Sequence, residues 1–98
     1  MSAIRKSARG EQCQIRIPGV CNGNPETVVL CHANGSAAGK GIGQKSHDLI
    51  SAYGCSACHD VYDRREKQWR DRFEVELAFW HGHARTLCIL IEKGLVKV

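Results

Sequence analysis

The sequence predicts one small α+β domain, with strands in its first half, helices in its second half and clustered cysteines linking the two. Three observations lead to this fold class. Residues 13–17 alternate like a strand and residues 27–32 are β-branched and apolar. Apolar residues recur at helical spacing after residue 55, and the 98 residues include six cysteines. A single hydrophobic core typically serves roughly 100 to 200 residues, so one domain, residues 1–98, is expected. A core this small is marginal, and cysteines can supply the additional stability it needs.

The first segments predict an N-terminal arm followed by a strand and a tight turn. Residues 1–10 are basic and are expected to form a flexible arm or a short helix. Residues 13–17 alternate like a strand. Pro18 and Gly19 then occupy the two central positions of a type II turn, in which proline fixes one φ and glycine accepts the positive φ.

A second predicted strand ends in a histidine. Residues 27–32 are β-branched and apolar and end at His32. Residues 33–46 contain four glycines together with Lys40 and Lys45, a composition that favours a mobile basic loop.

The second half of the chain predicts two helices. The first is expected to run from Cys55 to about residue 68, and the second opens at Asp71 and Glu74, which have capping-box spacing. Gly94 suits the position just after the end of this helix, and residues 95–98 are expected to add a short strand. Six apolar residues at spacings of 4, 3, 4, 3 and 4 predict its core-facing stripe: Phe73, Leu77, Trp80, Ala84, Leu87 and Ile91.

Four of the cysteines have the pattern of a structural zinc site. Cys55 and Cys58 form a CxxC, and Cys13 and Cys21 flank the predicted turn upstream. Tetrahedral Zn²⁺ takes four thiolate ligands at about 2.3 Å, and two turn-borne pairs are a common way to converge them. The basic N-terminus has no apolar segment after it, so we expect a cytoplasmic protein, in which clustered cysteines act as metal ligands more often than as disulfides. The two remaining cysteines are expected to be small buried apolar residues: Cys31 and Cys88.

The same motif has two other interpretations. CxxCH, with His59 after Cys58, is also the attachment site of c-type haem, for which His81 or His83 could supply the second axial ligand. A thioredoxin-like redox centre would require a βαβ context around the CxxC, which the sequence does not predict. His47, His81 and His83 are interpreted as ordinary surface histidines.

A second cation site is predicted one helical turn beyond the cysteines. His59 and Asp63 are four residues apart on the predicted helix, so their side chains share a face and can hold one cation between them. The zinc-bound cysteines would fix the start of this helix, which preorganises such a site. The net charge is +4, and residues 1–47 hold six lysines and arginines against two acids. This uneven charge favours an anionic partner such as nucleic acid.

These motifs together resemble a known family. A strand ending in Cys31-His32, a loop, and then CxxC followed by His59 on a helix resembles the zinc-supported HNH nucleases, which have the ββα-metal fold. Residues 16–27, 48–50 and 55–65 resemble, more closely, the small phage and prophage nucleases of the YbcO type. The resemblance extends from about residue 5 to residue 97.

The resemblance implies a set of roles for these residues. His32 is expected to be the general base, His59 and Asp63 to hold a catalytic Mg²⁺ or Mn²⁺, and the four cysteines to hold structural Zn²⁺. Many HNH enzymes have a metal-binding aspartate where this chain has Cys31, so either Asp63 or Asp48 is expected to supply the carboxylate. Four basic residues are expected to bind neighbouring phosphates: Lys40, Lys45, Arg64 and Arg65.

The expected function is therefore metal-dependent hydrolysis of DNA phosphodiester bonds, in phage recombination or DNA processing. The alternative is a zinc module without catalytic activity that binds nucleic acid or another protein. No stretch approaches the roughly 18 apolar residues of a membrane span, so no membrane partner is expected. The long helix offers spare apolar residues such as Phe79 to a second copy, which allows a homodimer.

Overall fold

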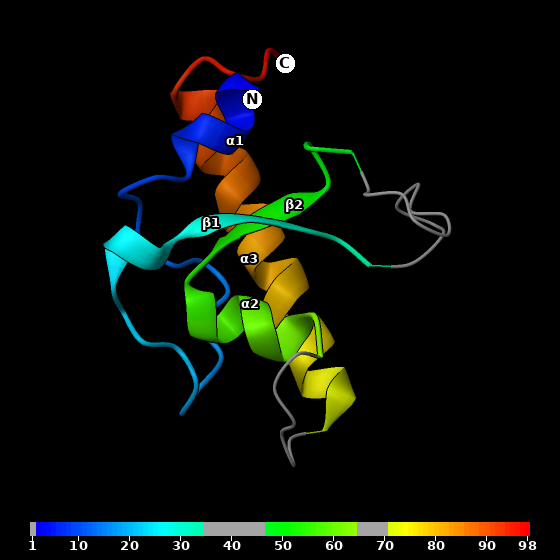
Figure 1. Cartoon of the computed structure of the whole chain (residues 1–98). Helices are drawn as coiled ribbons and strands as arrows, with labels where there is room; N and C mark the ends of the chain where they lie inside the picture. The colour runs from blue at the N-terminus through cyan, green and yellow to red at the C-terminus, as the bar shows by residue number, and fades with distance from the viewer. Residues whose placement is uncertain (1, 35–46, 65–70) are drawn as a thin grey trace.

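In the part of the chain that the structure describes, a small antiparallel sheet packs with three α-helices. The computed structural model describes residues 2–34, 47–64 and 71–98. In chain order the elements are α1 (Ala3–Ser7), a 3₁₀ turn (Pro25–Thr27), β1 (Val29–His32), β2 (Ser51–Gly54), α2 (Ser56–Tyr62) and α3 (Arg72–Glu92). Figure 1 shows α3 running past the two strands, with α2 beside its first half and α1 beside its last turns.

The two strands pair in antiparallel register, from Val29 opposite Gly54 to His32 opposite Ser51. The outer edge of β2 is covered by other elements. The Tyr53 N–H donates to Thr86 Oγ1 of α3 (2.9 Å), and Tyr53 O accepts from the Gln14 N–H (2.8 Å). His83 Nδ1 lies 2.8 Å from Ser51 O. Buried backbone groups need such partners, so these contacts fix the sheet against α3.

The predicted strand at residues 13–17 is wrong. These residues form a bend, because Arg16 has a left-handed φ of 56° and its guanidinium folds back onto Cys13 O (3.1 Å). The bend passes closely over α3 at Gly82, where an added Cβ would lie 2.8 Å from Gln14 O. The type II turn that follows agrees with the prediction, since Gly19 has φ 75° and the Val20 N–H donates to Ile17 O.

The core-facing stripe predicted for α3 is also wrong. The residues of α3 that are buried are Val75, Phe79, Gly82, Thr86 and Leu90. In contrast Phe73 is 71%, Leu77 46% and Trp80 40% exposed. Phe79 is fully buried and stacks on Tyr62 of α2, with ring centroids 4.1 Å apart, so it is not available to a second copy. Apolar residues recur at helical spacing on both faces of α3, and the face with the smaller side chains is the one that packs against β2.

The first predicted helix ends earlier than expected, at Tyr62 instead of about residue 68. Arg64 has a left-handed φ of 64°, which ends the helix. Arg72 of α3 then donates to the last α2 carbonyl groups, Val61 O (3.0 Å) and Tyr62 O. These bonds satisfy acceptors that a helix C-terminus leaves unpaired. Residues 65–68 of the prediction lie outside the described part of the chain.

The caps of α3 agree with the prediction. Asp71 accepts a hydrogen bond from the Phe73 N–H (2.9 Å) at the start. At the end Gly94 has φ 74° and donates to Ile91 O, and the Leu95 N–H donates to Leu90 O, which is the Schellman arrangement. The short strand predicted at residues 95–98 is wrong, because this segment bends and then has no regular structure. Among the described residues, no helix combines the length and the apolarity that crossing a membrane requires.

Candidate functional site

The four cysteines predicted to bind zinc converge at the start of α2. The Sγ atoms of Cys13, Cys21, Cys55 and Cys58 all lie within 4.8 Å of one another, and those of Cys21 and Cys55 are 3.9 Å apart. A tetrahedron with zinc–sulfur bonds of about 2.3 Å has edges of about 3.8 Å. The cluster therefore fits a metal such as zinc with little adjustment. Within residues 2–34, 47–64 and 71–98, it is the one group of three or more potential ligands close enough to hold an ion.

Local structure positions each sulfur. Cys55 is the N-cap of α2, and its Sγ accepts from the Cys58 N–H (3.4 Å) and from the Asn22 N–H (3.4 Å). The turn at residues 17–20 returns the chain so that Cys21 lies near Cys13. Backbone N–H groups aimed at sulfur favour the thiolate form that a metal requires.

The electrostatics of the cluster also suit a cation. A hydrogen bond from Cys58 lowers the pKa of the Cys13 thiol to about 4. The same contact, with burial, raises the pKa of Cys58 above its usual value. One thiolate is thus stabilised while its neighbour retains a proton, as expected when several sulfurs are crowded together. Because both CxxC sulfurs belong to this cluster, the haem interpretation of the motif loses its support.

The two remaining cysteines differ from each other. Cys31 is fully buried, as predicted, and burial raises its pKa well above the usual value, so it stays a neutral thiol. Cys88 was expected to be buried and is exposed instead, because the predicted core face of α3 is the outer face.

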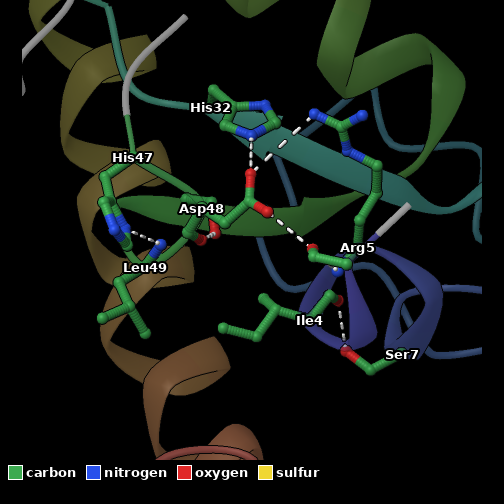
Figure 2. A network of polar contacts seen from close by, with 9 residues as sticks. Ile4, Arg5, Ser7, His32, His47, Asp48 and Leu49 are labelled. Carbon is green, nitrogen blue, oxygen red and sulfur yellow. Dashed lines mark hydrogen bonds and ion pairs between the residues drawn. The ribbon is translucent and has the colours of Figure 1, made fainter.

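A carboxylate at the entrance to β2 connects His32 with α1 (Figure 2). Asp48 Oδ1 lies 2.6 Å from His32 Nε2, and Asp48 Oδ2 accepts from the Ser2 hydroxyl (2.6 Å). The Arg5 guanidinium is 3.8 Å from Asp48 Oδ1. Hydrogen bonds from His32 and Ser2 lower the pKa of Asp48, so it is ionised at neutral pH. Its contact with Nε2 holds the His32 ring in one orientation.

The second predicted pair is in contact on α2. His59 Nε2 lies 2.9 Å from Asp63 Oδ2, in the i, i+4 arrangement that the spacing implied. The C-terminal end of α2 also lies near the end of β1, because the Tyr62 hydroxyl accepts from the Asn34 N–H (2.8 Å). Burial raises the pKa of Tyr62 to about 12, so this hydroxyl stays protonated.

Of the four predicted phosphate-binding residues, only one lies in the part of the chain that the structure describes. Arg64 is exposed at the end of α2. Lys40, Lys45 and Arg65 lie outside the described residues. His47 and His81 are exposed, as predicted, whereas His83 is partly buried against β2.

Sequence reasoning missed the contribution of α1. Ser2 and Arg5 were assigned only to a basic arm, although they contact Asp48 across 46 and 43 positions of chain. The Ser2-x-x-Arg5 spacing gave one signal, because Ser2 is a good N-cap residue and its hydroxyl accepts from the Arg5 N–H (3.1 Å). That signal predicts a helix at the N-terminus but does not predict that the helix contacts Asp48.

The strand pair followed by a helix, with histidines and clustered cysteines at its ends, defines a small α+β domain whose four cysteines could hold a metal. Comparison with known proteins identifies its family. The family described as "Putative nuclease YbcO" matches residues 2–95, and the chain belongs to it.

Relatives of known sequence and structure agree with this assignment. Two proteins named "Putative nuclease YbcO", from Escherichia coli (strain K12) and Enterobacteria phage 82, are each 48% identical over 97 residues. That alignment covers 99% of this chain and of each relative. A solved structure described as a bacteriophage protein from Escherichia coli K-12 has 46% identity and a TM-score of 0.76. It covers 94% of this chain and 100% of its own.

Proposed function

We propose that this protein is an HNH-type endonuclease that hydrolyses DNA phosphodiester bonds with the help of a divalent cation, in phage recombination or DNA processing. The observation that carries the proposal is the hydrogen bond between His32, the last residue of β1, and the ionised Asp48. The family name, the basic first half of the chain and the order of two strands and a helix support it.

His32 is the general base. It accepts a proton from water while the water oxygen bonds to phosphorus, and the P–O bond on the opposite side breaks as the leaving oxygen takes a proton from solvent. The unperturbed pKa of histidine, about 6.5, suits this role near neutral pH. Asp48 positions the ring through Nε2 and stabilises the imidazolium that forms. Because Asp63 lies beside the imidazole of His59 whereas Asp48 holds the His32 ring, we assign the metal-binding carboxylate to Asp63.

His59 and Asp63 would hold the catalytic divalent cation, which when bound supplies positive charge for the phosphate oxygens. Their contact at 2.9 Å places an imidazole and a carboxylate on one helix face, a donor pair that suits Mn²⁺ as well as Mg²⁺. Cys31, where many HNH enzymes have aspartate, is a neutral buried thiol and a poor ligand for a hard cation. The four-cysteine cluster holds Zn²⁺ for stability only. Phosphates of the DNA backbone are bound by Arg64 together with Lys40, Lys45 and Arg65.

Incubation of purified protein with supercoiled and linear DNA, with Mg²⁺, Mn²⁺ or no added cation, tests the proposal. We expect cleavage that requires the added cation. His32→Ala should lower the rate by about 10² to 10⁴-fold, the usual contribution of a positioned base, with the zinc content unchanged. His81→Ala is the matched control, because His81 is exposed on α3.

Two outcomes contradict the proposal. A folded, zinc-loaded His32→Ala protein with full activity removes His32 from the mechanism. A wild-type protein that binds DNA but cleaves it under none of these conditions favours the alternative, a zinc module that only binds.

A further inference from the structure

The N-terminal segment brings cations to the side of the His32–Asp48 pair. Residues 2–10 contain Arg5, Lys6 and Arg9 and no acidic residue. Lys6 and Arg9 are exposed, whereas the Arg5 guanidinium lies over Asp48 (Figure 2). Of these three cations, Arg5 is therefore the one next to the proposed base.

The backbone that carries Arg5 is held in place. Ser2 caps α1 through the Arg5 N–H and donates to Asp48 with the same hydroxyl. At the other end of the helix, the Ser7 and Tyr53 hydroxyls are 2.5 Å apart, and Ala8 is 1% exposed. A side chain on such an anchored turn approaches a ligand with little loss of backbone entropy.

The contact between Arg5 and Asp48 does not account for this placement. The shortest distance is 3.8 Å, and the side chains are 38% and 25% exposed. Exposed ion pairs contribute roughly 0 to 1 kcal/mol, and the same carboxylate oxygen already holds His32 at 2.6 Å. The planar guanidinium has five N–H donors and fits a phosphate in a bidentate manner, so an exposed group can bind phosphate without releasing Asp48 from His32.

We propose that Arg5 is a phosphate-binding residue of the same site, which holds the DNA backbone beside His32. The proposal rests on the proposed nuclease function and deepens it, because it assigns to α1 the contact that positions the substrate next to the base. The neighbouring Lys6 is exposed and adds positive charge for longer-range attraction.

Binding of a short DNA duplex without added Mg²⁺ or Mn²⁺, followed by cleavage with the cation, tests this role. The variants are Arg5→Gln, Arg5→Lys and, as the control with the same charge change on the same segment, Arg9→Gln. We expect Arg5→Gln to weaken binding about tenfold to hundredfold, the range for a hydrogen bond to a charged group, and kcat/KM to fall in parallel. Arg5→Lys should lie between Arg5→Gln and wild type, since lysine keeps the charge but loses the planar fork. Arg9→Gln should change binding less than threefold.

A readout on His32 separates substrate binding from a structural effect. In Arg5→Gln the NMR signal of the hydrogen-bonded His32 ring N–H should persist as in wild type, because Asp48 keeps its hydrogen bond to the ring. Equal losses in Arg5→Gln and Arg9→Gln, no loss in Arg5→Gln, or loss of this ring N–H signal would each overturn the role of Arg5. If wild type binds without cleaving and Arg5→Gln still loses binding selectively, the nuclease proposal fails while the phosphate site stands.

Discussion

Replacing one cysteine of the cluster tests the zinc site with the least disturbance of packing. Cys21 is the most accessible of the four, so Cys21→Ser removes a ligand without opening a cavity in the core. Structural zinc sites in small domains bind with about 10 to 16 kcal/mol. Divided evenly over four ligands, the loss is about 2.5 to 4 kcal/mol, or roughly 10² to 10³-fold in affinity.

The same loss should be visible as a change in stability. A domain of this length shifts its thermal midpoint by about 4 to 8 °C for each kcal/mol, so Cys21→Ser should melt roughly 10 to 30 °C lower in the presence of limited zinc. Full chelation removes a free energy comparable with the whole stability of a 98-residue domain, about 5 to 15 kcal/mol, and should largely unfold it.

The assay combines metal analysis, zinc competition with a chromogenic chelator, and thermal melts followed by circular dichroism. Cys88→Ser is the matched control, because Cys88 is exposed and lies outside the cluster. We expect one zinc per chain in wild type and Cys88→Ser. A wild-type protein without zinc, or a Cys21→Ser variant that binds zinc as tightly as the control, would refute the assignment.

Three further variants test the rest of the structure. Hydrogen bonds lower the folded-state pKa of Asp48 below 3.8, so its charge stabilises the fold above about pH 4, and that stability is lost as the pH falls through the folded pKa. Asp48→Asn should therefore melt below wild type at pH 6, with the gap narrowing below about pH 4; a constant gap would mean that Asp48 ionisation does not contribute. Phe79→Ala should cost about 3 to 5 kcal/mol in urea unfolding, whereas Phe73→Ala, on the outer face, should cost no more than about 0.5 kcal/mol. Equal costs would contradict the orientation of α3.

The parts of the fold that could be predicted are those encoded by local chemistry. Asp71 and Gly94 mark the ends of α3 because each satisfies backbone groups of its own helix. The predicted convergence of the four cysteines is confirmed. It could be predicted because the CxxC and the turn each bring two sulfurs together locally. The contact between His59 and Asp63 follows from helical spacing alone.

The orientation of α3 could not be predicted from hydrophobicity, because its two faces are both apolar at helical spacing. The choice depends on the close approach of other elements. Gly82 lies against the bend at residues 14 and 15, and Thr86 supplies a hydroxyl to the edge of β2. A glycine and a threonine lower the hydrophobicity of this helix face. The glycine allows the backbone of another segment to approach closely, and the threonine hydroxyl accepts a hydrogen bond from a strand N–H that a larger apolar side chain would leave unpaired. In a domain with a two-stranded sheet, satisfying the open strand edge outweighs burying the larger side chains.

The same reasoning explains why α1 belongs to the candidate site although its residues carry no motif that predicts such a role. Asp48 is an ionised group three residues before β2, and a carboxylate there needs donors that the two strands cannot supply, since their N–H groups pair with each other or with α3. His32 supplies one donor and Ser2 another, and Ser2 is available because it begins a helix packed against the strands. Arg5, three residues further on, then lies over the same carboxylate. Under the proposed function, a phosphate bound to Arg5 would approach His32 from the side of Asp48, so α1 would contribute both to the orientation of the His32 ring and to the binding of the substrate.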